Sequence, residues 1–172
     1  MAVDANTLQS LIEAELTSLR DERVEDHIRT LLVAPHVILR PWDYGAPDQA
    51  YPCWTVLDHG DGSDTGIAYC EHGFGPRCPW GLVWMGRTAG RSLSMGMDSG
   101  WFRTFLDAYF ESFAASDLPI WRLFTREDAE PGEPLSEELS WNEAWRRCEE
   151  ARRNKSSEQF MVHHTIRHGA RA

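Results

Sequence analysis

The sequence has no long apolar run and almost no lysine. A transmembrane helix needs about 20 consecutive apolar residues, and no run in the 172 residues approaches that length. The N-terminus has neither a basic start nor an apolar core, so it does not predict a secretory signal. Of the 17 basic residues, Lys155 is the only lysine. We therefore expect a cytoplasmic protein that has no membrane partner.

Basic residues are outnumbered by acidic ones, and this excludes one class of partner. The chain carries 27 acidic and 17 basic residues, for a net charge of -10. An acidic protein repels phosphate backbones, so we expect no nucleic-acid partner. Residues 127–150 hold nine acidic and two basic residues, and the basic stretch 151–172 is too short to reverse the balance. The charge favours a basic partner.

The short motifs of several enzyme classes are missing. The sequence contains neither G-x-x-x-x-G-K-[ST] nor G-x-G-x-x-G, so it does not predict nucleotide binding. It also lacks the nucleophile elbow G-x-S-x-G. We expect no cofactor and favour a protein without catalytic activity. A catalytic group formed by residues far apart in the sequence stays open.

The periodicity of the apolar residues predicts an α+β fold. Helical spacing covers residues 7–33, as one helix or as two with Asp21 as a cap. Short aromatic and β-branched runs between Gly, Pro and Asp predict an antiparallel meander over residues 36–85. An aromatic helix is expected at 102–113, capped by Asp98 or Ser99, and a capping box at Ser140 starts another. We expect a largely antiparallel sheet of five to six strands, covered by the N-terminal helical segment and two later helices.

The same patterns place the whole chain, 1–172, in a single domain. The N-terminal helical segment 7–33 is expected to pack on an α+β core formed by residues 36–168. Residues 119–124 and 159–168 are expected to be strands, and residues 127–134 an acidic loop that contains proline. No internal repeat and no linker interrupts this order.

Cysteine and histidine lie close together near the middle of the chain. The four cysteines are expected to be thiols in a reducing compartment. Cys70, His72 and Cys78 are ligand types for zinc, but their spacing matches no structural zinc pattern. A hairpin with Leu57 opposite Gly66 would bring Cys53 opposite Cys70. We therefore predict no metal site here, and interpret these cysteines as small buried thiols beside a turn.

Two loops rich in glycine carry arginine and aromatic residues. Residues 72–81 contain Arg77 and Trp80, and residues 87–98 contain Arg87 and Arg91. These arginines could form an anion pocket with loop amides, and Trp80 is a residue type typical of interfaces. Arg77, Arg87, Arg91 and Trp80 are therefore the candidate ligand-binding residues.

The aromatic content completes the functional prediction. Eight tryptophans are many for this length, and aromatic surface beside acidic charge is typical of protein recognition. We expect a non-enzymatic cytosolic protein-binding module. By analogy of size and charge, it could be a bacterial immunity-type protein that neutralises a basic toxin. The alternatives are a small-ligand-binding protein or enzyme with a pocket near the 73–98 loops, and a subunit of a larger assembly. The sequence does not indicate an oligomeric state.

Overall fold

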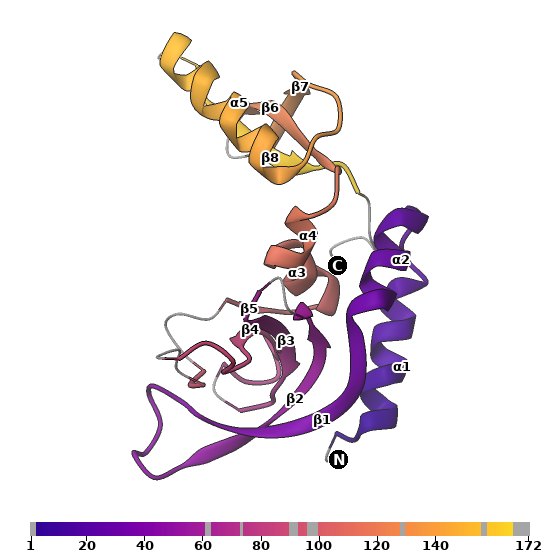
Figure 1. Cartoon of the computed structure of the whole chain (residues 1–172), viewed down its shortest axis with the longest axis vertical. Coiled ribbons are helices and arrows are strands. Elements are labelled where there is room, and N and C mark those ends of the chain that lie inside the picture. The colour runs from indigo at the N-terminus through magenta and orange to yellow at the C-terminus, as the bar shows by residue number, and fades with distance from the viewer. Residues whose placement is uncertain are drawn as a thin grey trace. The chain divides into compact units, whose positions relative to one another are not determined.

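The computed structural model describes residues 3–60, 63–72, 74–89, 93–95, 100–127, 130–155 and 158–166 (Figure 1). It confirms the α+β class with antiparallel sheets. The chain divides into two compact units, of which the first is Met1–Phe113 with His168–Ala172 and the second is Ala114–Arg167. The expectation of a single domain stays a prediction. The strands are shared between two sheets, of five and three strands.

The first unit begins with two capped helices. α1 (Ala5–Leu16) and α2 (Glu22–Leu31) are separate because Asp21 caps the second helix by accepting from the amide of Arg23. This cap decides between the one-helix and two-helix alternatives. α1 packs against the first strand. The buried faces of the helices consist of Leu8, Ile12, Leu16, Val24 and Ile28.

The sheet of the first unit is an antiparallel meander in chain order. Its strands are β1 (Leu32–Pro41), β2 (Ala50–Asp58), β3 (Thr65–Tyr69), β4 (Trp80–Trp84) and β5 (Trp101–Phe102). The predicted register is off by one residue at its start, because Leu57 lies opposite Ile67. A bulge then shifts the register, so Trp54 lies opposite Tyr69. Continued by one residue, this register brings Cys53 opposite Cys70, as expected.

The aromatic helix is shorter than its pattern predicts. α3 (Phe105–Phe110) is capped by Thr104, whose side chain accepts from the amide of Asp107 at 3.0 Å. The expected caps, Asp98 and Ser99, lie outside the described residues. The helix ends before α4 (Phe113–Ser116), where Phe113 is 62% exposed. The aromatic side chains of this helix therefore cover the core only as far as Phe110.

The second unit has its own sheet and core. β6 (Trp121–Glu127) lies between β7 (Glu130–Pro134) and β8 (Phe160–His164), and α5 (Trp141–Asn154) packs against β6 and β8. Ser140 caps α5 as expected by accepting from the amide of Glu143 at 3.4 Å, whereas the Glu143 carboxylate pairs with Arg146 and Arg147. The expectation of a loop up to residue 134 is wrong, because 130–134 pairs with β6 as an edge strand, a position that tolerates proline.

Candidate functional site

Five aromatic side chains from four segments of the first unit gather around Trp42. We call them the aromatic surface: Trp42, Tyr44, Tyr51, Phe74 and Trp101. Ring centroids lie 5.7 Å apart for Trp42 and Tyr44, and 6.4 Å apart for Trp42 and Phe74. Phe74 stacks on Trp101 at 5.7 Å. Tyr44 is 60% exposed and Phe74 45%, so the cluster is open to solvent.

The backbone around Trp42 fixes this cluster. Trp42 follows directly on β1, and its neighbours Pro41 and Asp43 exchange backbone hydrogen bonds with Met95 at 2.8 and 3.1 Å. The Tyr51 hydroxyl donates to the side chain of Gln49 at 2.8 Å, within the β1–β2 turn. Side chains that are already held in place lose less entropy when a partner binds.

Trp101 is held by a close approach to Gly81. The two residues face each other across β4 and β5. A Cβ atom at Gly81 would lie 2.7 Å from the Trp101 ring, so any larger residue would displace the indole. The buried indole N–H groups of Trp42 and Trp101 have no hydrogen-bond partner among the described residues.

Acidic residues surround the aromatic surface in the sequence. No lysine or arginine lies between Arg40 and Arg77. Asp43 and Asp48 are exposed in the β1–β2 turn that carries Tyr44, and Glu71 is exposed beside His72. His72 in turn lies 5.0 Å from the Tyr51 ring. We call Asp43, Asp48 and Glu71 the acidic rim.

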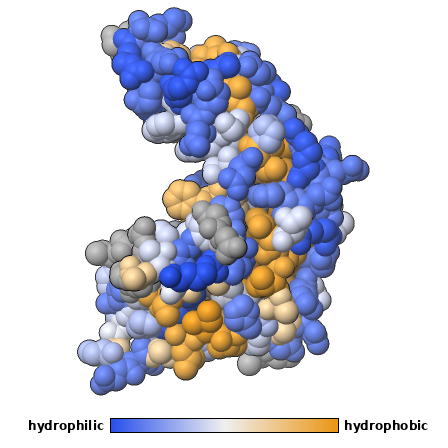
Figure 2. Space-filling model, in the orientation of Figure 1, coloured by the Kyte–Doolittle hydropathy of each residue, from blue (hydrophilic) through white to orange (hydrophobic). Residues whose placement is uncertain are grey.

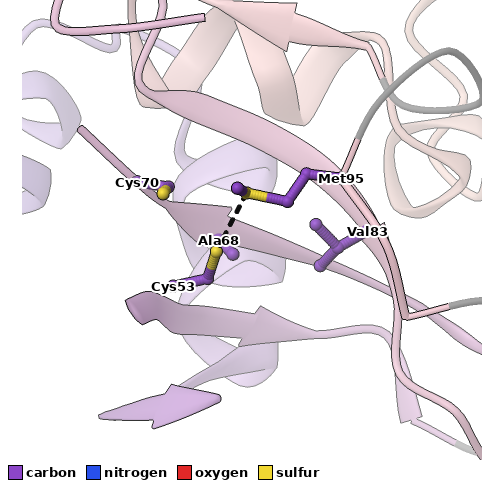
Figure 3. Packing of buried hydrophobic residues seen from close by; sticks show 5 residues of the cluster. All are labelled: Cys53, Ala68, Cys70, Val83 and Met95. Atoms are coloured by element: carbon purple, nitrogen blue, oxygen red, sulfur yellow. Dashed lines mark hydrogen bonds between the residues drawn. The ribbon is translucent and has the colours of Figure 1, made fainter. Parts of the chain in front are cut away.

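A buried sulfur cluster lies beneath the aromatic surface. Cys53, Cys70 and Met95 are at most 1% exposed, and Trp42 and Trp101 pack against them. The Cys53 thiol lies 3.1 Å from the Met95 sulfur (Figure 3). A hydrogen bond from Cys53 lowers the pKa of Cys70, and the same bond, together with burial, raises the pKa of Cys53.

Arg40 is a buried charge close to this cluster. Its side chain is completely buried, and Nη1 donates to the carbonyls of Trp84 at 2.8 Å and Leu93 at 3.2 Å. Nε and Nη2 have no hydrogen-bond partner among the described residues. Burial lowers the pKa of Arg40. A buried guanidinium without a carboxylate is unusual, because unpaired buried charges are costly.

Among the described residues, the structure brings no two of the predicted ligand-binding residues into contact. Trp80 is 3% exposed and packs edge-on against Tyr69 and Phe105. Arg87 forms ion pairs with Asp58 and Asp64. Trp80 is therefore a core residue, and Arg87 holds the turn between β2 and β3.

The other two candidate arginines complete this picture. Arg77 is exposed, and its side chain has no hydrogen bond or ion pair within the described part of the chain. Arg91 lies outside the described residues. No ring contact, ion pair or hydrogen bond joins Arg77, Trp80 and Arg87 to one another in the described ranges. The anion pocket stays a prediction.

The three potential metal ligands differ in their exposure to solvent. Cys70 is buried, His72 is exposed against Tyr51, and Cys78 is half-buried. Within the described residues, no group of three His, Cys, Asp or Glu side chains is placed to hold a metal ion. Cys70 instead meets Cys53 and Met95. The strand register predicted the first of these contacts, whereas no local signal in the sequence indicated Met95 or Arg40.

Comparisons add no functional assignment. No known family model, curated protein or solved structure is significantly similar to this chain. In the part of the chain that the structure describes, no helix has the length and apolar character needed to cross a membrane.

Proposed function

We propose that the protein is a non-enzymatic binding module that recognises a basic protein through the aromatic surface and the acidic rim. The observation that carries the proposal is the exposure of Tyr44 and Phe74, at 60% and 45%, on side chains packed around Trp42. Exposed aromatic residues at fixed positions are the residues that contribute most to binding at protein interfaces.

Lysine and arginine side chains fit this surface chemically. A guanidinium or ammonium group over an aromatic ring gains about 0.5–2 kcal/mol from the cation–π interaction. Asp43 and Asp48 flank Tyr44 in the same turn and supply the opposite charge. The net charge of -10 adds a longer-range attraction, which raises the association rate and weakens with salt.

β1 also has an exposed apolar face. Val37 is 44% and Leu39 63% exposed, and Figure 2 shows hydrophobic residues gathered over the middle of this strand. A stable interface covers about 800 Å² on each partner, whereas one buried aromatic side chain covers roughly 150–250 Å². Val37 and Leu39 lie on the opposite face of the sheet from Trp42 and Tyr51, so this face is not part of the proposed interface.

A more specific form of the proposal is a bacterial immunity-type protein that blocks a basic toxin. Its support is the small size, the acidic charge and the aromatic surface, which are the properties that such an inhibitor needs. The proposal also places the protein in the cytoplasm, where its four thiols would stay reduced.

The test compares three forms of the chain as baits in extract of the host cell. They are the wild type, the double variant Tyr44→Ser with Phe74→Ser, and a control with Leu135→Ser and Trp145→Ser. The control residues are similarly exposed, at 49% and 44%, but belong to the second unit. Proteins retained at equal molar amounts are quantified by mass spectrometry at low and high salt.

The proposal predicts a basic protein that the wild type and the control retain and that the double variant loses at least tenfold. Two residues that contribute about 1–2 kcal/mol each would produce that loss. Retention should fall as salt rises, because the charges are exposed. Equal retention by all three baits, or binding that salt does not weaken, would contradict the proposal.

A further inference from the structure

Three sulfur atoms from separate segments meet in the core of the first unit. Cys53 belongs to β2, Cys70 follows β3, and Met95 comes from the segment that pairs with the residues beside Trp42. The Cys53 thiol donates to the Met95 thioether at 3.1 Å, and Cys70 belongs to the same buried cluster. Figure 3 shows the Met95 side chain reaching toward both cysteines.

Arg40 gives this cluster an electrostatic peculiarity. Its guanidinium is fully buried, and two of its three nitrogens have no hydrogen-bond partner among the described residues. The register of β1 and β2 places Arg40 on the same face of the sheet as Cys53, opposite Tyr51. Buried charges are normally paired with an opposite charge. The cluster therefore has a place for one negative charge that neutral thiols do not supply.

We propose that Cys53, Cys70 and Met95 form a binding site for a soft monovalent metal ion, copper(I), whose charge Arg40 balances. Thiolate and thioether sulfur are the ligands that select copper(I). Binding forms two thiolate bonds and one thioether bond, and the two thiol protons leave to water. The bound unit, one positive ion with two thiolates, then carries a charge of -1 beside the positive Arg40. This inference does not depend on the proposed protein partner.

The same accounting disfavours zinc. A divalent ion with two thiolates and a thioether is neutral, and Arg40 would stay without a counter-charge. Structural zinc sites are also almost always four-coordinate, and this cluster has three sulfur ligands. The buried arginine is thus the feature that distinguishes monovalent from divalent ions.

Binding requires a small rearrangement of the sulfurs. Metal–sulfur bonds of about 2.3 Å in a trigonal arrangement set the sulfur atoms about 4 Å apart. Cys53 and Met95 are 3.1 Å apart, so the ion replaces their hydrogen bond and separates them. Met side chains have three rotatable bonds and adjust readily.

The first experiment titrates the reduced full-length chain with copper(I) under anaerobic conditions against bicinchoninate, a coloured chelator of copper(I). The chain carries Cys78→Ser, which removes the half-buried thiol that could bind copper by itself. We expect one equivalent bound per chain and a higher melting temperature, because the ion binds only the folded state. X-ray absorption should then show sulfur ligands alone. Nitrogen or oxygen ligands, or no competition with the chelator, would overturn the proposal.

The ligands are tested with shape-conserving variants. Cys53→Ser and Cys70→Ser should each abolish competition with the chelator. Met95→Leu keeps the side-chain volume and should weaken copper(I) binding at least tenfold. Cys148→Ser is the matched control, since this buried thiol belongs to the core of the second unit, and it should bind as before. If Met95→Leu binds as tightly as the wild type, or Cys148→Ser abolishes binding, the site is not this one.

Arg40 is a positioning residue, and its test measures metal preference. Arg40→Met should weaken copper(I) binding roughly 10- to 100-fold, the usual effect of losing an outer partner of a metal site. Zinc binding by the same variant should not weaken. Arg40→Lys keeps the charge and should restore the preference for copper(I). An equal loss for both metals would indicate a purely structural role and would contradict the charge argument.

Discussion

Arg87 clamps the turn between β2 and β3, and replacing it should destabilise the first unit. Nη1 and Nη2 donate to the two carboxylate oxygens of Asp58 at 2.8 and 2.9 Å. Nη2 also donates to the carbonyls of Gly60 at 3.1 Å and Ser63 at 2.9 Å. The Arg87 side chain thus donates four hydrogen bonds to acceptors in one turn.

The expected loss for Arg87→Met is about 2 kcal/mol of unfolding free energy. Hydrogen bonds to charged groups contribute about 1.5–3 kcal/mol each when they are buried. Arg87 is 41% exposed, and solvent screening reduces that contribution strongly. The Met side chain keeps the apolar part of the contact, so the difference reports the guanidinium.

Urea denaturation followed by circular dichroism measures this loss, with Arg77→Met as the matched control. Arg77 is exposed and without a partner in the described residues, so its change should stay within about 0.5 kcal/mol. Equal stability of the wild type and Arg87→Met would refute the clamp and return Arg87 to the predicted anion pocket.

The clamp also predicts a pH dependence. Hydrogen bonds from Arg87 lower the pKa of Asp58 below its usual value. A carboxylate with a lowered pKa stabilises the fold above its unfolded pKa, about 3.9, and this stability is lost as the pH falls through the lower folded value. The difference between the wild type and Arg87→Met should therefore be constant near pH 7 and shrink below about pH 4.

Three further predictions concern other parts of the molecule. Gly81→Ala should cost about 1–3 kcal/mol in urea denaturation and alter tryptophan fluorescence, because the new methyl group overlaps the Trp101 ring. Glu15 accepts hydrogen bonds from the first amides of α3, and burial raises its pKa. The wild type should therefore lose stability relative to Glu15→Gln as the pH rises from 4 to 7, and a stability difference that does not change with pH would contradict this. Under native conditions, a thiol reagent should label Cys78 first, because the other three cysteines are buried, and rapid labelling of all four would show that they are not.

Local signals predicted much of the fold. The caps at Asp21 and Ser140 are set by side chains hydrogen-bonded to amides within three residues, so the sequence alone indicates them. Short aromatic and β-branched runs between turn residues predicted the meander. The assumed hairpin with Leu57 opposite Gly66 also predicted the approach of Cys53 to Cys70. The bulge that shifts the register between β2 and β3 was not predictable, because it depends on how the two strands pair and not on the sequence of either strand alone.

The candidate site was predictable only in kind. Composition indicated surplus aromatic surface beside acidic charge, but it did not indicate which tryptophans are exposed. Trp80 was the one tryptophan among the four predicted binding residues and is buried, whereas Trp42 and Trp101 belong to the aromatic surface. The sequence of a strand shows which residues share a face, but not which of the two faces is buried. Tertiary packing decides which face is buried. Arg40 and Met95 meet through such packing as well.

The most direct test of the proposed function is native mass spectrometry of the chain purified from its own host at low salt. The wild type should appear as a one-to-one complex with a basic protein, and added salt should dissociate it. The Tyr44→Ser, Phe74→Ser variant, purified in the same way, should appear alone. A wild-type chain without any protein partner, or a partner that the double variant retains equally, would contradict recognition through the aromatic surface.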